Sequence, residues 1–220
     1  MNTSDPSPSA PVPDRPERRT PARRLFEGRV SERRLEILEA AALLFGERGY
    51  AATSMRDIAR RVGLLGGSLY HHIRSKEELF AEIHDLALEG VSDLIRQRVE
   101  SASDPWERLE LACLTMLEEQ LTDHSITLPL MNDFRAVPPD LRVRLVPKRD
   151  AFEAVFADLV ADLPLADGLD RTLFRIMLLT ELNNVSAWYQ PGGKLSPAEI
   201  AHQIVRVFRD GGAVRTAGAG

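Results

Sequence analysis

The chain has 220 residues, of which 44% are hydrophobic, so it is long enough to bury the core of one large domain or of two modest ones. It contains no run of 18 or more apolar residues, which excludes a membrane-spanning helix, and no apolar segment follows the charged N-terminal stretch, which argues against a signal peptide. Its one cysteine, Cys113, excludes an internal disulfide and fits a reducing, cytoplasmic location.

The net charge of −5 is unevenly distributed along the chain. Residues 1–76 contain 14 basic and 9 acidic residues, whereas the remainder contains 14 basic (28 − 14) and 24 acidic (33 − 9) residues. A basic N-terminal part joined to an acidic body suggests that the N-terminal part meets a polyanion. The charge distribution alone is equally compatible with chance clustering on solvated faces, so only the motifs can indicate whether the N-terminal part binds a polyanion.

The N-terminal segment, residues 1–28, is predicted to be a disordered arm, because it is rich in proline and lacks apolar periodicity. The stretch "RPERRTPARRLFEGRVSERR" (residues 15–34) holds eight arginines against three glutamates. A flexible basic arm of this kind can enter the minor groove of DNA or remain a solvated tail, and the sequence leaves both open.

Helical periodicity begins at Ser31, where apolar residues recur at three- and four-residue steps up to Gly46 or Gly49. A short second helix is expected after Ser54, which forms a capping box with the residue three positions on, and Gly63 is a suitable C-terminal stop. The stretch "GLLGGSLYHHI" (residues 63–73) then forms a turn and a further short helix.

Two other interpretations of "GLLGGSLYHHI" fail on spacing. A phosphate-binding loop needs a lysine after the glycines and a preceding strand, and neither accompanies Gly66 and Gly67. His71 and His72 are adjacent, so on a helix they point about 100° apart and cannot share one metal ion. No metal site or other cofactor is therefore expected.

The rest of the chain continues in the same helical style. Helices are expected from Ser75 to about Val99, from Asp104–Pro105 onward and through the apolar stretch 125–134. Further helices are expected across 138–163, with a kink or a break at Pro147, and over 170–189 and 196–210. Because no run of alternating β-branched residues is present, the chain is predicted to be all-α with about nine helices. The expected organisation is a disordered arm (1–28), a helix-turn-helix domain (29–76), a helical ligand-binding and dimerisation domain (77–212) and a flexible tail (213–220).

Two short helices around a tight turn are the signature of a helix-turn-helix motif. The motif needs a small residue facing the partner helix, here Ala59, a glycine at the turn, here Gly63, and apolar anchors that hold the helices crossed. The helix after the turn would enter the major groove of DNA, with Tyr70 and His71 at its flank and His72 packed inward. The expected anchors are Ile58, Val62, Leu64 and Leu69.

Residues 31–80 resemble the DNA-binding domain of the TetR family of transcriptional regulators. The matching parts are the turn "FGERGY" (45–50), the helix opening "TSMRDIA" (53–59), the recognition helix "GSLYHH" (67–72) and the start of the next helix, "SKEEL" (75–79). The family resemblance implies a nine-helix regulator that binds an operator in double-stranded DNA, and not an enzyme. No Ser-His-Asp, paired-carboxylate or Cys-His arrangement stands out in the sequence to suggest catalysis.

The resemblance implies DNA contacts from residues at three helix starts. At Leu65 and Gly66 many family members have a hydroxyl residue followed by a basic one, so here the cap must come from elsewhere and Gly66 offers only backbone. The operator of this chain should therefore differ from those of better-known members. The residues expected at DNA are Ser54, Arg56, Gly66, Gly67, Ser68, Tyr70, His71 and Lys76.

The resemblance further implies that the last two long helices form a homodimer and that the C-terminal domain encloses a small-molecule effector whose binding releases the operator. The stripe Ile200, Ile204, Val207 and Phe208 suits a four-helix dimer seam, although the same stripe could face the chain's own core. The ending "WYQPGG" (188–193) resembles a branch that controls fatty-acid, steroid and acyl-CoA catabolism, which suggests a fatty acid, steroid acid or acyl-CoA thioester as effector.

Candidate pocket residues are apolar side chains punctuated by polar ones, as in cavities that orient a ligand. Each of them is equally compatible with a plain core position. They are Met116, Leu130, Met131, Phe134, Phe152, Phe156, Met177, Glu181, Asn184 and Trp188.

Overall fold

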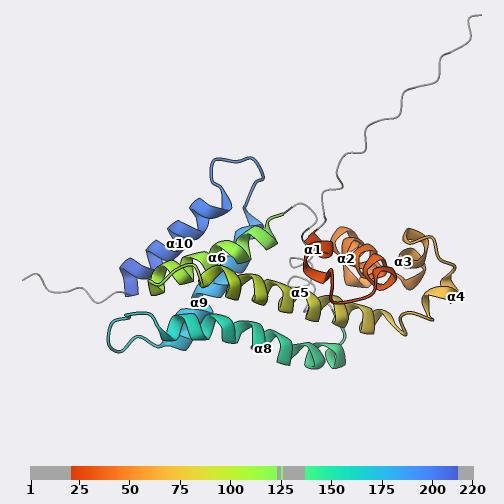
Figure 1. The fold of residues 1–220 in the computed structure, drawn as a ribbon, viewed down its shortest axis with the longest axis horizontal. Coiled ribbons are helices and arrows are strands. Elements are labelled where there is room, and N and C mark those ends of the chain that lie inside the picture. The colour runs from red at the N-terminus through yellow and green to blue at the C-terminus, as the bar shows by residue number, and fades with distance from the viewer. Residues whose placement is uncertain (1–20, 123–124, 126–136, 213–220) are drawn as a thin grey trace, which may run out of the picture.

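The computed structural model describes residues 21–122, 125 and 137–212. These residues form nine α-helices and contain no β-strand, which confirms the predicted all-α class (Figure 1). None of these helices is both long and apolar enough to cross a membrane. The helices are α1 (Pro21–Phe26), α2 (Glu32–Ala52), α3 (Met55–Arg61), α4 (Gly66–Leu69), α5 (Lys76–Val99), α6 (Pro105–Gln120), α8 (Pro139–Ala161), α9 (Arg171–Asn184) and α10 (Pro197–Gly212), with a 3-10 turn η2 (Val185–Ala187) after α9.

Helices α1 to α4 form a small unit at one end of the molecule, which we call the head (Figure 1). The apolar stripe of α2 is buried, and an aromatic cluster of Phe45, Tyr50 and Phe80 joins α2 to α5, with ring centroids 5.0 to 5.8 Å apart. Gly49 has φ 80°, so the regular helix stops there as predicted and the chain turns toward α3.

Local capping signals in the sequence are realised as predicted. Ser54 caps α3 through its hydroxyl, which accepts from the backbone N–H of Asp57 at 3.2 Å, while the Asp57 carboxylate accepts from the Ser54 backbone N–H. The hydrogen bonds that the Asp57 carboxylate accepts from the Ser54 hydroxyl and, second, from the Ser54 backbone N–H lower the pKa of Asp57. Asp104 caps α6 in the same way, with Pro105 in the first turn.

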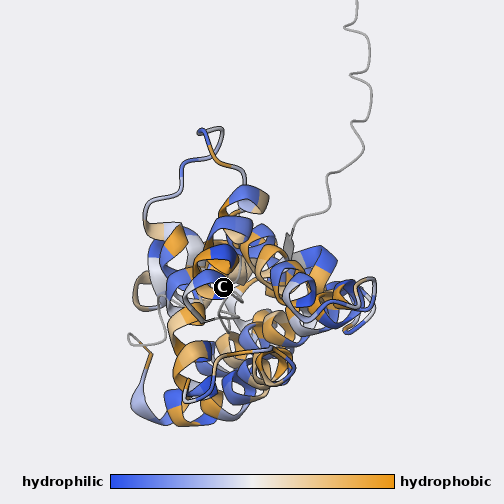
Figure 2. Cartoon of the chain, turned by 90° about the vertical axis from the view of Figure 1, so that its left-hand side faces the viewer, coloured by the Kyte–Doolittle hydropathy of each residue, from blue (hydrophilic) through white to orange (hydrophobic). Residues whose placement is uncertain are grey.

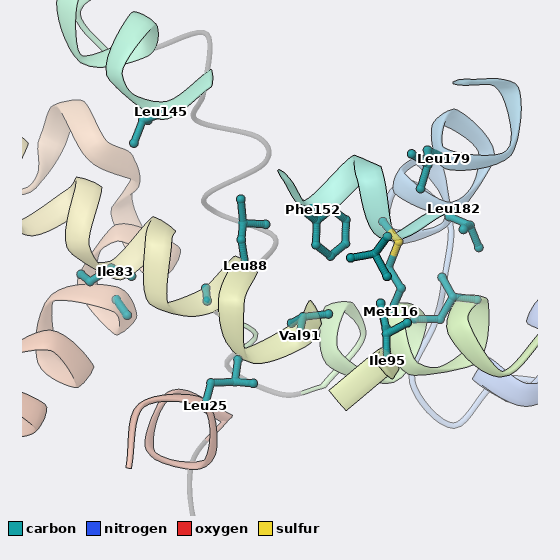
Figure 3. Close-up of a cluster of buried hydrophobic side chains, with 14 of the residues drawn as sticks. Leu25, Ile83, Leu88, Val91, Ile95, Met116, Leu145, Phe152, Leu179 and Leu182 are labelled. Carbon is teal, nitrogen blue, oxygen red and sulfur yellow. The ribbon is translucent and has the colours of Figure 1, made fainter. Parts of the chain in front are cut away.

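Helix α5 joins the head to the remaining helices, which we call the body (Figure 1). Its first turns bury Leu79 and Phe80 in the head, and its last turns bury Ile95 and Val99, where α5 packs on α6. Figure 3 shows Ile95 lying beside Met116 of α6. The expected domain boundary at residues 76/77 therefore falls at the start of one continuous helix that serves both units.

The body is a bundle in which α6 packs on both α5 and α10, and α8 packs along α5. The helices alternate polar and apolar segments along their length (Figure 2), as expected for amphipathic helices around a common core. Helix α8 continues through Pro147. Helix α9 ends at Asn184, five residues before the predicted end at Tyr189, and the 3-10 turn η2 follows it directly.

The predicted disordered arm is wrong over its last residues. Residues 21–26 form α1, whose Leu25 and Phe26 are buried against α5. Gly90 permits this packing, because a Cβ at that position would lie 2.9 Å from Leu25 Cδ2. The burial of α1 thus depends on a residue far along the chain, which local composition could not reveal. Residues 1–20, the tail from 213 and most of the apolar stretch 125–134 lie outside the described residues.

Candidate DNA interface and effector region

Helices α3 and α4 are held by a short, well-bonded turn. Gly63, with φ 66°, reverses the chain, and the backbone N–H of Leu64 donates to the carbonyl of Ala59 at 2.8 Å. Ile58, Ala59 and Leu69 are buried beneath the turn. The anchors expected for a helix-turn-helix therefore hold the two helices together, with Val62 and Leu64 partly buried beside them.

Most of the predicted DNA contacts line a single open concavity of about 760 Å³ between α3, α4 and the start of α5. Ser68 is half-buried on α4, and His71 is exposed just after it. Six of the eight residues expected at DNA are thus gathered at one concavity of the head. The concavity is lined by Ala51, Ala52, Thr53, Ser54, Met55, Arg56, Gly66, Gly67, Tyr70 and Lys76.

Lys76 has internal partners in addition to its predicted role. Its Nζ donates to the carbonyls of Tyr50 at 2.8 Å and Thr53 at 3.0 Å, and it lies 4.2 Å from the Tyr50 ring centroid. The ammonium group therefore satisfies the last carbonyls of α2 and fixes the start of α5 against the α2–α3 junction. An ammonium has three N–H donors, so one donor remains for a phosphate oxygen.

His72 does not pack inward as predicted. Helix α4 ends at Leu69, four residues before the predicted end, so Tyr70, His71 and His72 lie in a turn and all three are exposed. The residue that packs inward is Ile73, and the His72 carbonyl instead accepts from Arg34 Nη1 at 2.8 Å. Because the chain leaves the helix at Leu69, the side chains that follow do not continue the buried face of α4.

Helix α4 begins without a side-chain cap from its N-cap residue. Leu65 occupies the N-cap position, and its side chain makes no capping hydrogen bond. The side chain is instead 80% exposed.

Ion pairs connect the head to the body. Arg24 of α1 pairs with Glu119, a buried carboxylate of α6, and burial raises the pKa of Glu119. Arg29, which follows α1, binds Asp93 of α5 at 2.6 Å. These ion pairs link the region around α1 directly to α6 and α5.

The candidate pocket residues divide into three groups. Met116, Phe152 and Phe156 are buried, and Figure 3 shows Met116 and Phe152 among the side chains that fill the space between α5, α6 and α8. Leu130, Met131 and Phe134 lie outside the described residues. The remaining four are exposed on the outer side of α9 or just beyond it, so they do not line an interior cavity: Met177, Glu181, Asn184 and Trp188.

Two further polar side chains of this region, neither of them predicted from the sequence as a pocket residue, are buried. His84 lies one turn before Leu88 on α5, and Gln120 lies one turn after Met116 on α6. Gln120 Nε2 donates to Asn183 of α9 at 2.9 Å, whereas Gln120 Oε1 and His84 Nε2 have no hydrogen-bond partner among the described residues. Lone polar residues in amphipathic helices give no sequence signal that separates a pocket wall from a surface.

The apolar stripe of α10 faces mostly inward. Ile200 is buried, Ile204 and Phe208 pack on the core, and the Phe208 ring lies 5.2 Å from that of Phe174. Of the four predicted seam residues only Val207 is exposed. The exposed apolar side chains near it belong mainly to α9 and the loop before it: Leu169, Leu173, Ile176 and Met177.

Cys113 is fully buried in α6, and burial raises the pKa of its thiol. Within residues 21–122, 125 and 137–212, no group of three or more His, Cys, Asp or Glu side chains is placed to hold a metal ion.

An all-α chain with an exposed helix-turn-helix and an open concavity beside it, lined by Ser54, Arg56 and Lys76, is typical of a DNA-binding regulator. Comparison with known proteins agrees. Residues 37–83 match the family "Bacterial regulatory proteins, tetR family", and residues 102–211 match "Tetracyclin repressor-like, C-terminal domain". The chain belongs to the TetR family of transcriptional regulators.

The transcriptional repressor KstR2 is among the relatives of this chain. The protein from Rhodococcus jostii (strain RHA1) is 33% identical over 187 residues, which are 82% of this chain and 91% of that protein. The protein from Mycobacterium tuberculosis (strain H37Rv) is 30% identical over 190 residues, covering 84% and 94%. The M. tuberculosis KstR2 structure matches 86% of this chain and 98% of its own with TM-score 0.69 and 29% identity. PfmR from Thermus thermophilus matches 81% and 98% with TM-score 0.67 and 28% identity.

Proposed function

We propose that this protein is a homodimeric transcriptional repressor that leaves its operator when a small apolar or acyl-CoA-like effector binds. The observation that carries the DNA-binding part is the concavity between α3 and α4, where Ser54, Arg56 and Lys76 surround the exposed glycines of α4. Hydroxyl and basic side chains around a recognition helix are the groups that position a protein on phosphates. Repression is supported by the KstR2 relatives, which are transcriptional repressors.

A fluorescence anisotropy titration with DNA from upstream of the protein's own gene tests this proposal. Wild-type protein should bind one fragment in preference to a shuffled duplex, and Arg56→Ala should weaken binding about five- to a hundredfold, because it removes a charged hydrogen-bond donor from the interface. Arg144→Ala, which changes an exposed arginine of α8, is the matched control and should bind as wild type. Failure of the wild type to select any fragment at low salt would refute the proposal.

The basic arm offers a second expected result. Because α1 is part of the packed head, the deletion that isolates the arm removes residues 1–20 and not 1–28. If the arm lies in the minor groove, log Kd plotted against log salt should become shallower by about 0.9 for each phosphate that the arm no longer neutralises. An unchanged slope would assign the arm to solvent.

The homodimer is supported by the exposed apolar patch of Leu169, Leu173, Ile176, Met177 and Val207, which we call the α9/α10 patch. Apolar side chains of this size seldom gather on the surface of a protein that stays monomeric. A two-fold axis through the patch would place α9 and α10 of one protomer against the same helices of its partner. The seam is thus proposed on α9 with Val207, in place of the α10 stripe expected from the sequence.

The effector site is proposed where α5, α6 and α8 pack around Met116, Phe152 and Phe156, and an effector would have to part these packed side chains in order to bind. His84 Nε2 and Gln120 Oε1 are buried and have no partner in the described part of the chain. A carboxylate or thioester oxygen of an effector would accept from His84 Nε2–H, whereas Gln120 Oε1 would accept from a hydroxyl group of the effector. The KstR2 of M. tuberculosis is a ketosteroid transcriptional regulator, which favours steroid-derived acids and their CoA thioesters over short acids.

Thermal unfolding with panels of fatty acids, steroid acids and acyl-CoA thioesters tests the effector. A true effector at 100 times its Kd should add about 2.7 kcal/mol of stability and should release the operator in the anisotropy assay. Gln120→Leu should reduce the shift for an effector with a polar end more than for an apolar analogue. A compound that stabilises the protein without releasing DNA would contradict the regulatory role of this site.

A further inference from the structure

Leu65 is not explained by the chain's own fold. It is the most exposed of the large apolar side chains that the structure describes, at 80%, and it stands where a polar residue would cap α4. A leucine at this position cannot accept the capping hydrogen bond from the backbone N–H groups of α4, and its apolar side chain is exposed to water. Both effects lower the stability of the folded chain, so the presence of leucine is explained if its side chain contacts another molecule.

The two glycines after Leu65 lead to the same conclusion. Neither Gly66 nor Gly67 has a positive φ, and a Cβ built on either would meet no atom within 4 Å. The backbone therefore does not require glycine at these positions, and the packing does not require it either. Glycine also weakens a helix relative to alanine. The reason for both glycines must again lie outside the chain, in a surface that approaches α4 more closely than a side chain would permit.

DNA is the surface that fits, because Gly66 and Gly67 line the same concavity as Arg56 and Lys76, and Leu65 directly precedes them. The edges of the bases in the major groove carry hydrogen-bonding groups and one apolar group, the C5-methyl of thymine. An exposed leucine has no hydrogen bond to offer and gains only by losing water against another apolar group. The thymine methyl is the part of the groove that can provide this.

We propose that Leu65 determines operator specificity by contacting the C5-methyl group of a thymine, and that Gly66 and Gly67 let the backbone of α4 lie against the neighbouring base edge. The proposal rests on the operator binding proposed above and adds the identity of one base that is read. It predicts a thymine in each half-site opposite the start of α4.

Replacing single thymines of the selected operator by deoxyuridine tests the contact, since this change removes only the methyl group. For the wild type, one position in each half-site should weaken binding about fourfold, the value of one buried methyl, and both together about fifteenfold. For Leu65→Ala the same replacements should change the affinity by less than about twofold. Val143→Ala, which shortens a similarly exposed apolar side chain on α8, should retain the wild-type sensitivity.

The glycines are tested separately with Gly66→Ala. Its Tm should be equal to or higher than that of the wild type, because space is open around the new Cβ, while its operator affinity should fall at least about tenfold. Wild-type affinity in Gly66→Ala, or deoxyuridine sensitivity that survives in Leu65→Ala, would overturn the inference and leave operator binding intact. A wild-type protein that selects no operator would overturn the inference together with the proposed function.

Discussion

Ile176→Glu is expected to convert the proposed dimer into monomers and to lower operator affinity by at least about a hundredfold, since each half-site then binds alone. Ile176 lies in the middle of the exposed side of α9 and is 48% exposed in the single chain. In a two-fold interface each substitution would appear twice, and each would bury an unpaired carboxylate at a cost of several kcal/mol. Sedimentation velocity over a range of protein concentrations measures the change.

The matched control for this variant is Val143→Glu. Val143 is 73% exposed on α8, away from the α9/α10 patch, so an added carboxylate there remains in water. This control should sediment as the wild type does and bind the operator with wild-type affinity. If Ile176→Glu sediments like its control, the α9/α10 patch is not the dimer interface.

Phe80→Ala is expected to lower the free energy of unfolding by about 3–5 kcal/mol, a large part of the about 5–15 kcal/mol of a typical protein. Phe80 is fully buried, with its ring 5.4 Å from that of Phe45 and 5.0 Å from that of Tyr50. It joins α5 to the head, so its removal should loosen the attachment of the helix-turn-helix to the body as well as leaving a cavity. Urea unfolding followed by circular dichroism gives the value.

Tyr70→Ala provides the comparison for stability, because it removes an aromatic ring of the same head that is 55% exposed. Tyr70→Ala should change the free energy of unfolding by no more than about 0.5 kcal/mol. If Phe80→Ala and Tyr70→Ala lower the free energy of unfolding equally, the aromatic cluster does not hold the head to α5.

The capped start of α3 and the turn of the helix-turn-helix could be predicted from the sequence, because their signals are local, whereas the end of α4 could not. The Ser54 cap and the Gly63 turn act within a few residues of themselves, so the sequence around them contains all the information needed. The burial of Ile58, Ala59 and Leu69 follows from that local geometry.

Features that depend on distant partners could not be predicted. Composition placed Leu25 and Phe26 in a disordered arm, yet Gly90 on α5 leaves room to bury them. Periodicity identified an apolar stripe on α10 but could not show that Phe208 of this stripe packs against Phe174 of the same chain and not against a partner. The exposed Met177 resembles a pocket residue by type, since methionine is common in cores, cavities and interfaces alike.

The burial of Cys113 has a practical consequence for spectroscopy. The chain contains no other cysteine, and a buried thiol with a raised pKa reacts poorly with maleimide or methanethiosulfonate reagents. A cysteine introduced at Arg60, exposed on α3, would therefore accept a spin label or fluorophore at one known position without removing the native residue. In a dimer, the separation of two such labels would measure directly how far apart the two heads stand, with and without an effector.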